Sequence, residues 1–239
     1  MRVNWNYIKM LMLCIIVIGL FAFSNVKNDE RKVLNIEILF EGEDNLFVTH
    51  ETVSKLLIQN QGSVKNVPKE TLDLNLLESA LNSNPMIKSA QVFVSVDGNL
   101  TAEIEQKKPI ARVQNSQPFY IDETGSYMPL STNYTARVPI VTGQVEQNKL
   151  KTVYKMAQKI TNDDFLKRHV TQIHQYKDNR LSLRLRQVDF EVYVGDLKNL
   201  DKKINNLKAF FNKATKDKIL NNYSKVNLQF DSQVVCSKS

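Results

Sequence analysis

The 239-residue chain has few of the residues that form disulfides, break helices and strands, or commonly act in catalysis and metal binding. It contains only 2 cysteines, 7 glycines, 6 prolines and 3 histidines. Cys14 lies inside an apolar segment long enough to enter a membrane, and Cys236 lies three residues from the C-terminus. The two would lie on or within different sides of that membrane, so we expect no disulfide between them and a fold held by its hydrophobic core. The low glycine and proline content excludes a long flexible linker. Hydrophobic residues at 42% and charged residues at 24% are typical of globular proteins.

Signatures of catalysis and of nucleotide binding are missing as well. The sequence has no Gly-rich phosphate loop, no Gly-x-Ser-x-Gly and no Cys/His dyad. His169 and His174 are five residues apart, a spacing that suits neither a strand nor a helix face, and no third metal ligand is obvious. We therefore expect a protein that is not an enzyme, with no catalytic residue, no cofactor and no metal.

One short stretch invites a chemical interpretation. Residues 122–125 read Asp-Glu-Thr-Gly, which superficially resembles the Asp-Thr-Gly of aspartic proteases. Those enzymes need two facing carboxylates, and here no second copy exists and Glu123 precedes the Thr-Gly pair. Apolar runs lie on both sides, and Gly125 can adopt a positive φ. The stretch is therefore predicted to be the turn of a hairpin.

Basic residues outnumber acidic residues only slightly. The net charge is +7, and it falls to +5 when Arg2 and Lys9 are set aside. The basic residues are spread along predicted helices and strands, which indicates solvated faces; weak attraction to an anionic membrane surface is the alternative. No nucleic-acid-binding motif is present.

The N-terminal segment is different because residues 10–23 contain no charged or strongly polar side chain. It fits a cleaved signal peptide, with Ala22-Phe23-Ser24 as cleavage site, or an uncleaved anchor that extends over residues 7–26. Lys9 and Arg2 precede the segment. By the positive-inside rule, either alternative leaves the head in the cytoplasm and exports the rest of the chain.

Hydrophobic periodicity predicts a β-α-α-β-β unit next. Leu34, Ile36 and Ile38 alternate along the first strand and lie on one face of it. Asp97-Gly98 is a strong hairpin signal between the last two strands. The predicted elements are a strand at 33–41, a helix after the Thr49 N-cap, a helix at 72–82, and strands at 87–96 and 100–106.

The second half is predicted to be rich in strands, with two amphipathic helices at 150–160 and 197–211. Strands are expected at 110–114 and 181–194, and a hairpin at 118–130. In the last strand, 223–235, the side chains of Val226, Leu228 and Phe230 are predicted to point inward.

Two resemblances follow from these patterns. The segment LLESALNSNPMIKSAQVFV, residues 76–94, resembles the helix-to-strand core of a POTRA domain. The order of an apolar anchor, a POTRA-like unit and a β-rich domain resembles the FtsQ/DivIB family of bacterial cell-division proteins, and the resemblance covers nearly the whole chain. Its family-like positions are Lys108, Pro109, Ala111, Tyr120, Ile121, Asp122, Gly125, Pro139, Ile140, Gly143, Tyr223, Val226, Leu228 and Phe230. Asn227 and Phe230 depart from the Asp and Tyr usual in the family.

The resemblance implies an α+β protein with a single transmembrane helix. Its expected parts are a cytoplasmic head (1–7), an anchor (8–26), a POTRA-like domain (33–107) and a β-rich domain (108–235). It further implies a divisome scaffold in the inner membrane, with the bulk of the chain in the periplasm at the division site. The implied partners are FtsB/DivIC-type and FtsL-type coiled-coil proteins, and through them septal peptidoglycan synthesis. The alternative is a chaperone-like module of an export or outer-membrane assembly system.

The expected partner site is an edge strand at the end of the second domain. Such a strand can take up a partner's backbone by strand addition. The candidate residues are Tyr223, Lys225, Val226, Asn227, Leu228, Gln229 and Phe230. The Asp97-Gly98 hairpin is a second candidate.

Overall fold

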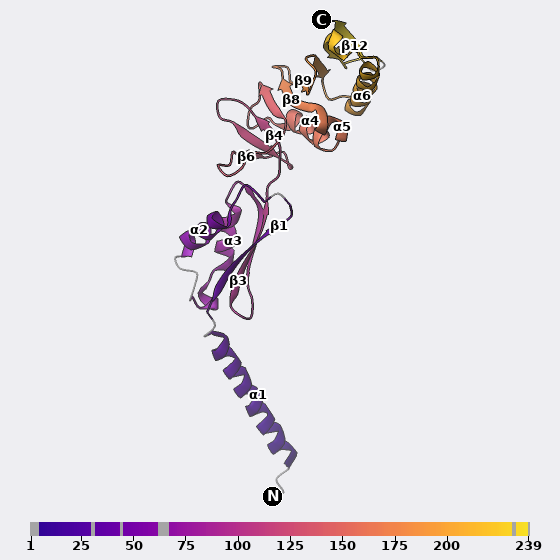
Figure 1. The fold of residues 1–239 in the computed structure, drawn as a ribbon. Helices are drawn as coiled ribbons and strands as arrows, with labels where there is room; N and C mark the ends of the chain where they lie inside the picture. Colours follow the sequence, from indigo (N-terminus) through magenta and orange to yellow (C-terminus); the bar gives the residue numbers. More distant parts are fainter. Residues whose placement is uncertain (1–4, 30–31, 44, 62–66, 231–232, 239) are drawn as a thin grey trace. The chain divides into compact units, whose positions relative to one another are not determined.

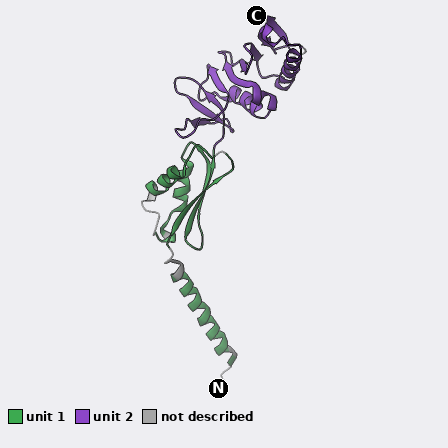
Figure 2. Ribbon diagram, viewed as in Figure 1, with its two compact units in different colours: residues 1–106 green, residues 107–239 purple. Residues whose placement is uncertain are grey.

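The computed structural model describes residues 5–29, 32–43, 45–61, 67–230 and 233–238. The chain divides into two compact units, residues 1–106 and 107–239 (Figures 1 and 2). Unit 1 begins with α1, Trp5–Asp29, in which the twenty residues Tyr7–Val26 are predominantly apolar and exposed along their length. A helix of this length and composition can cross a bilayer.

The rest of unit 1 has the predicted β-α-α-β-β order. Its three-stranded sheet has the order β1-β3-β2, in which β1 runs parallel to β3 and β2 runs antiparallel to it. Its elements are β1 (Asn35–Glu41), α2 (His50–Gln61), the short 3-10 helix η1 (Lys69–Thr71), α3 (Leu74–Asn82), β2 (Ile87–Val94) and β3 (Asn99–Gln106). Thr49 caps α2 as predicted, because its hydroxyl accepts the Thr52 amide at 3.3 Å.

The two helices cover one face of this sheet. Ala102 in the central strand lies in register with Ile38 on one side and Val92 on the other, and this row faces the helices. Leu77 and Leu81 of α3 are fully buried against it. The helical spacing of these leucines therefore does produce the core that the sequence predicted.

Leu34 departs from the prediction. It was expected to lie in the first strand, on the same face as Ile36 and Ile38, but it precedes β1 and is 59% exposed. Its backbone amide donates to the carbonyl of Gly98 at 2.8 Å, in the turn between β2 and β3. The chain at Leu34 thus runs along the hairpin turn, and the side chain is not covered by the helices.

Unit 2 is built on one mixed sheet. Among the described residues the strand order is β12-β11-β10-β9-β8-β7-β4-β5-β6. Neighbours are antiparallel except for the pairs β4/β7, β7/β8 and β10/β11, which are parallel. The strands are β4 (Pro109–Val113), β5 (Phe119–Asp122), β6 (Tyr127–Pro129), β7 (Ile140–Gly143), β8 (Val170–Gln175), β9 (Leu181–Leu185), β10 (Glu191–Gly195), β11 (Tyr223–Asn227) and β12 (Val235–Lys238).

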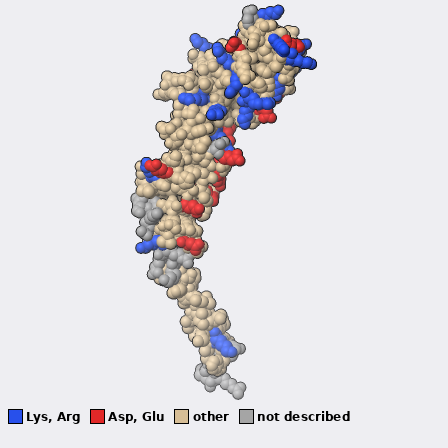
Figure 3. Space-filling model, in the orientation of Figure 1, with Lys and Arg blue, Asp and Glu red and all other residues tan. Residues whose placement is uncertain are grey.

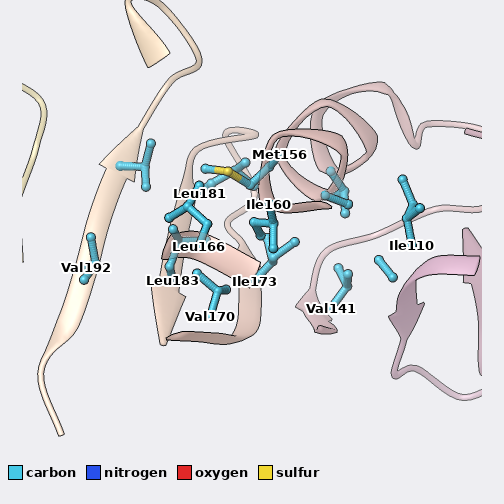
Figure 4. Packing of buried hydrophobic residues seen from close by; sticks show 14 of the residues in the cluster. Ile110, Val141, Met156, Ile160, Leu166, Val170, Ile173, Leu181, Leu183 and Val192 are labelled. Atoms are coloured by element: carbon cyan, nitrogen blue, oxygen red, sulfur yellow. The ribbon is translucent and has the colours of Figure 1, made fainter. Parts of the chain in front are cut away.

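The core of unit 2 lies between this sheet and its helices, α4 (Lys151–Thr161), α5 (Asp164–His169) and α6 (Leu200–Lys216). Figure 4 shows Met156 and Ile160 of α4 beside Ile173 of the sheet. All three side chains are at most 2% exposed.

Helix α5 was not predicted. Its six residues are too few to show a helical period, and it depends on its cap: the Asp163 carboxylate accepts the amides of Phe165 and Leu166, both at 3.1 Å. Helix α6 begins three residues later than predicted, because Asn199 has a left-handed φ of 52°. A single 3-10 turn, η2 (Leu220–Asn222), connects α6 to β11.

The predicted hairpin turn after β5 is confirmed. Strands β5 and β6 pair antiparallel, and Gly125 has a φ of 84°. The Asp122 carboxylate is buried, and its Oδ1 accepts the amides of Thr124 and Ser126, both at 2.9 Å. The Nζ of Lys107 lies 3.4 Å from Oδ2. Asp122 is thus held in a structural role, stabilising the turn and the start of unit 2.

Candidate protein-binding edge

The predicted site strand lies one position inside the edge of the sheet. Strand β11 is flanked by β10 on one side and by β12 on the other, so its backbone is already paired on both sides. The expectation that Val226–Phe230 forms the edge is therefore wrong. After β11 the chain turns, and Asn227 accepts the Gln229 amide at 3.0 Å. The chain then returns as β12, which the sequence pattern had merged with the preceding strand.

Two of the candidate residues belong to the core. Val226 is fully buried and Leu228 is 1% exposed. The Leu228 amide also donates to the carbonyl of Tyr193 in β10 at 2.9 Å. Tyr223 is half-buried, with its ring centre 5.4 Å from that of Phe210 in α6. These side chains hold β11 in place beneath the helix layer.

The other candidates reach the surface. Lys225 is partly exposed, and its Nζ lies 3.8 Å from Glu191 and 4.7 Å from the ring centre of Tyr193. Gln229 is exposed and packs over Gly195, where a Cβ atom would lie 2.8 Å from its Cγ. Phe230 was predicted to point inward, but it follows the turn and is 46% exposed. The predicted set therefore divides by exposure: two residues are buried, two are exposed, and Tyr223, Lys225 and Asn227 are intermediate.

Strand β12 forms the edge itself. Because Leu228 donates to β10, the backbone groups of the alternate residues Lys225 and Asn227 point the other way, towards β12. Their register partners Ser237 and Val235 then point towards β11. The backbone groups of Cys236, between these two, are directed away from the sheet. A partner strand would meet them first.

Strand β12 was not predicted as a separate strand, and the sequence shows why. Val234, Val235 and Cys236 form a short run of strand-favouring residues after the polar Asp231-Ser232-Gln233. The polar triplet was a turn signal within what was taken as one strand. Residues 231–232 lie outside the described part of the chain.

The electrostatics near the edge centre on Glu191. Tyr176 donates its hydroxyl to the Glu191 carboxylate at 2.6 Å. Partial burial alone would raise the pKa of Glu191, but hydrogen bonds from Ser182 and Tyr176 and the charge of Lys225 outweigh it and lower this pKa. Burial raises the pKa of the Cys236 thiol. An anionic Glu191 therefore holds the Lys225 side chain beside β10.

A buried lysine fixes the elements behind the edge. Lys203 of α6 is only 5% exposed. Its Nζ donates to the carbonyls of Val194 and Asp196, at 3.0 and 2.7 Å, and to the Asp196 carboxylate at 2.9 Å. The hydrogen bond from Lys203 lowers the pKa of Asp196. Helix α6 is thereby tied to the end of β10.

The two neighbouring histidines have separate surroundings. His169 ends α5, where its ring stacks on Phe165 with ring centres 4.5 Å apart. His174 lies in β8, with Nδ1 3.0 Å from the Thr142 hydroxyl. Within the described ranges, no group of three or more His, Cys, Asp or Glu residues is arranged to hold a metal ion.

Comparison with known families agrees with this division of the chain. A POTRA-like domain model matches residues 32–105, and a model described as FtsQ/DivIB, C-terminal related, matches residues 108–237, more than half of the chain. No curated protein gives a significant match. Both matching families consist of non-enzymatic scaffold domains, and the long apolar α1 fits a membrane-anchored protein. The chain belongs to the FtsQ/DivIB family of cell-division proteins.

Proposed function

We propose that this chain is a non-enzymatic divisome scaffold that binds small bitopic coiled-coil proteins of the FtsB/DivIC and FtsL types. Through them it helps to recruit and regulate septal peptidoglycan synthesis. In this proposal α1 stays in the cytoplasmic membrane with its N-terminus in the cytoplasm, and both units act outside it, at the division site. Family membership and the edge position of β12 support the proposal.

The proposed mechanism is strand addition to β12. The outward-directed backbone N–H and C=O groups of Cys236 would supply main-chain hydrogen bonds, which give affinity but little specificity. Specificity would come from accessible side chains near the edge, chiefly Lys225, Gln229 and Phe230. Val226 and Leu228 contribute indirectly, by holding β11 and therefore β12 in position.

The position of β12 carries this proposal. A short edge strand with exposed Val235 and Lys238 presents both backbone and side chains to a partner. The alternative, a chaperone-like module of an export system, does not account for the match of unit 2 to the division family.

The test compares Cys236→Pro with Cys236→Ala in the tagged full-length protein, purified from membranes. Proline removes the backbone donor that points outward, whereas alanine keeps the donor and removes the same thiol. We expect coiled-coil membrane proteins to copurify with the wild type and with Cys236→Ala. Their recovery with Cys236→Pro should fall at least about tenfold, because the loss of one interfacial hydrogen bond weakens binding by about that factor.

Thermal melting of each variant shows whether unit 2 is still folded. If a folded Cys236→Pro variant retains its partners, strand addition at β12 is refuted while the scaffold function stands. If no coiled-coil membrane protein copurifies even with the wild type, the scaffold function itself fails.

A further inference from the structure

Two large aliphatic side chains are exposed at one end of unit 1. Leu34 is 59% exposed and Val96, in the turn between β2 and β3, is 68% exposed. Single exposed apolar residues are common on protein surfaces. These two are unusual because they lie at the end of the unit where the apolar helix α1 enters.

The backbone joins these two residues in one compact structure. Leu34 donates its amide to Gly98 at 2.8 Å, and Gly98 donates to Ser95 at 3.1 Å across the turn that contains Val96. Gly98 has a φ of 83°, and a Cβ there would lie 2.5 Å from the Lys32 carbonyl oxygen and 3.6 Å from Leu34 Cγ. We call Leu34 and Val96 the apolar tip.

The chain between α1 and the apolar tip is short. The apolar span ends at Val26, and Lys32 already forms a β-bridge with Pro68 of the folded unit. Three helical residues at about 1.5 Å each and three further residues at up to about 3.6 Å each span at most about 15 Å. The polar interface of a bilayer is itself roughly 5–8 Å thick on each side. The tether thus keeps the tip close to the head groups.

The opposite end of unit 1 provides a contrast. Strand β3 runs for eight residues from Asn99, next to the tip, to Gln106, a distance of about 23 Å. There the Gln106 side chain accepts the amides of Phe47 and Val48, both at 3.0 Å. The adjoining Leu46 is 45% exposed. This end has an exposed aliphatic residue too, but the tether does not hold it near the bilayer.

We propose that the apolar tip inserts into the head-group region of the bilayer that holds α1, and so orients unit 1 on the membrane. Leu34 and Val96 would supply apolar contact with the upper acyl chains, as interfacial segments do. Lys32, exposed beside the tip, would face lipid phosphates, whereas the neighbouring Asp97 would stay on the aqueous side.

The test measures thiol reactivity in the full-length protein reconstituted into phospholipid nanodiscs. Val96→Cys and Leu46→Cys are made separately in a Cys14→Ala, Cys236→Ala background and labelled with a charged, water-soluble maleimide. From exposure in water alone, the thiol at position 96 should react at least as fast as the one at 46. Insertion reverses this order, and we expect the thiol at 96 to react at least about tenfold more slowly.

A second variant tests whether labelling at position 96 is slow because the tip inserts or only because the short tether holds it near the membrane. Adding Leu34→Ser to Val96→Cys removes the remaining aliphatic side chain of the apolar tip. Because Leu34 is exposed, folding should be preserved, and a melting curve checks this. Insertion predicts that labelling at 96 then accelerates several-fold. The proposal is overturned if position 96 labels as fast as position 46, or if Leu34→Ser leaves the slow rate unchanged.

Discussion

The two units differ most in charge. Residues 1–106 carry 9 Lys and Arg against 13 Asp and Glu, whereas residues 107–239 carry 23 against 12. In Figure 3 acidic side chains follow one side of the POTRA-like unit, and basic side chains dominate the visible face of unit 2. The modest overall charge of +7 therefore conceals an acidic unit and a strongly basic one. The basic residues that the sequence pattern indicated as solvated faces are thus concentrated in unit 2.

The units also differ in how they use ion pairs. In unit 2 several acids lie between helices: Lys159 reaches Asp201 at 2.6 Å, and Lys208 reaches Asp163 at 2.6 Å. The outer sheet face of unit 1 is acidic, and there Lys88 pairs with Glu105 at 2.9 Å. These two acids of unit 2 thus connect its helices, whereas the pair in unit 1 lies on the sheet.

The largest expected effect tests whether the units are independent. Leu81 in α3 and Leu207 in α6 are both fully buried helix leucines, one in each core. Each change to alanine should lower the free energy of unfolding of its own unit by about 2–5 kcal/mol. Calorimetry with hydrogen exchange, resolved by peptide, assigns each loss. If one substitution lowered the free energy of unfolding of both units, the two units would unfold together.

Next in size is the effect of Gly98→Ala compared with Gly42→Ala. Both glycines have positive φ, 83° and 79°, but a Cβ at Gly42 meets nothing within 4 Å. Gly42→Ala should cost about 1 kcal/mol from backbone strain alone. Gly98→Ala should cost roughly 2–3 kcal/mol, because the Lys32 carbonyl must also move. Equal losses in urea unfolding of unit 1 would contradict the close approach of these segments.

A smaller loss is expected in unit 2 from Lys203→Met. Methionine fills similar space but leaves the carbonyls of Val194 and Asp196 without their donor. We expect a loss of about 1–3 kcal/mol in the stability of unit 2, since a buried unsatisfied acceptor is costly. The exposed Lys202→Met is the matched control and should be nearly neutral. Indistinguishable variants would mean that the buried ammonium has no net stabilising role.

The smallest effect should depend on pH. Partial burial would raise the pKa of Asp163, but hydrogen bonds from Lys208 and from the amides of Leu166 and Phe165 outweigh it and lower this pKa. A lowered pKa in the folded state gives stability that is present above the ordinary value of 3.8 and lost as the pH falls through the folded value.

Asp163→Asn keeps a capping oxygen but loses the charge facing Lys208. We therefore expect a loss of about 1 kcal/mol or less at neutral pH, which shrinks in acid as the wild type loses the same contribution. Melting curves between pH 7 and pH 3 measure this difference. A difference that grows on acidification would refute the assignment.

Local patterns predicted unit 1 better than the edge of unit 2. Leu77 and Leu81 repeat at helical spacing, and Asp97-Gly98 marks a tight turn, so neighbouring residues carried the information. Which strand lies at the edge of the larger sheet depends on pairing between strands that are far apart in the sequence. Val226 and Leu228 show the alternation of a half-buried strand whether or not β12 covers their backbone. Exposure of Leu34 was likewise unpredictable, because it depends on the distant Gly98.

The parallel pairing of β1 with β3 also sets an order of events during biogenesis. Asn35 lies opposite Asn99, 64 positions later, with α2, α3 and β2 between them. As the chain is made from its N-terminus, β1 emerges directly after α1 and must wait for its strand neighbour until residue 106 has been synthesised. During that interval the exposed Glu37 and Glu41 place repelling charges along β1. Such charges would discourage the waiting strand from pairing with other nascent chains at the membrane.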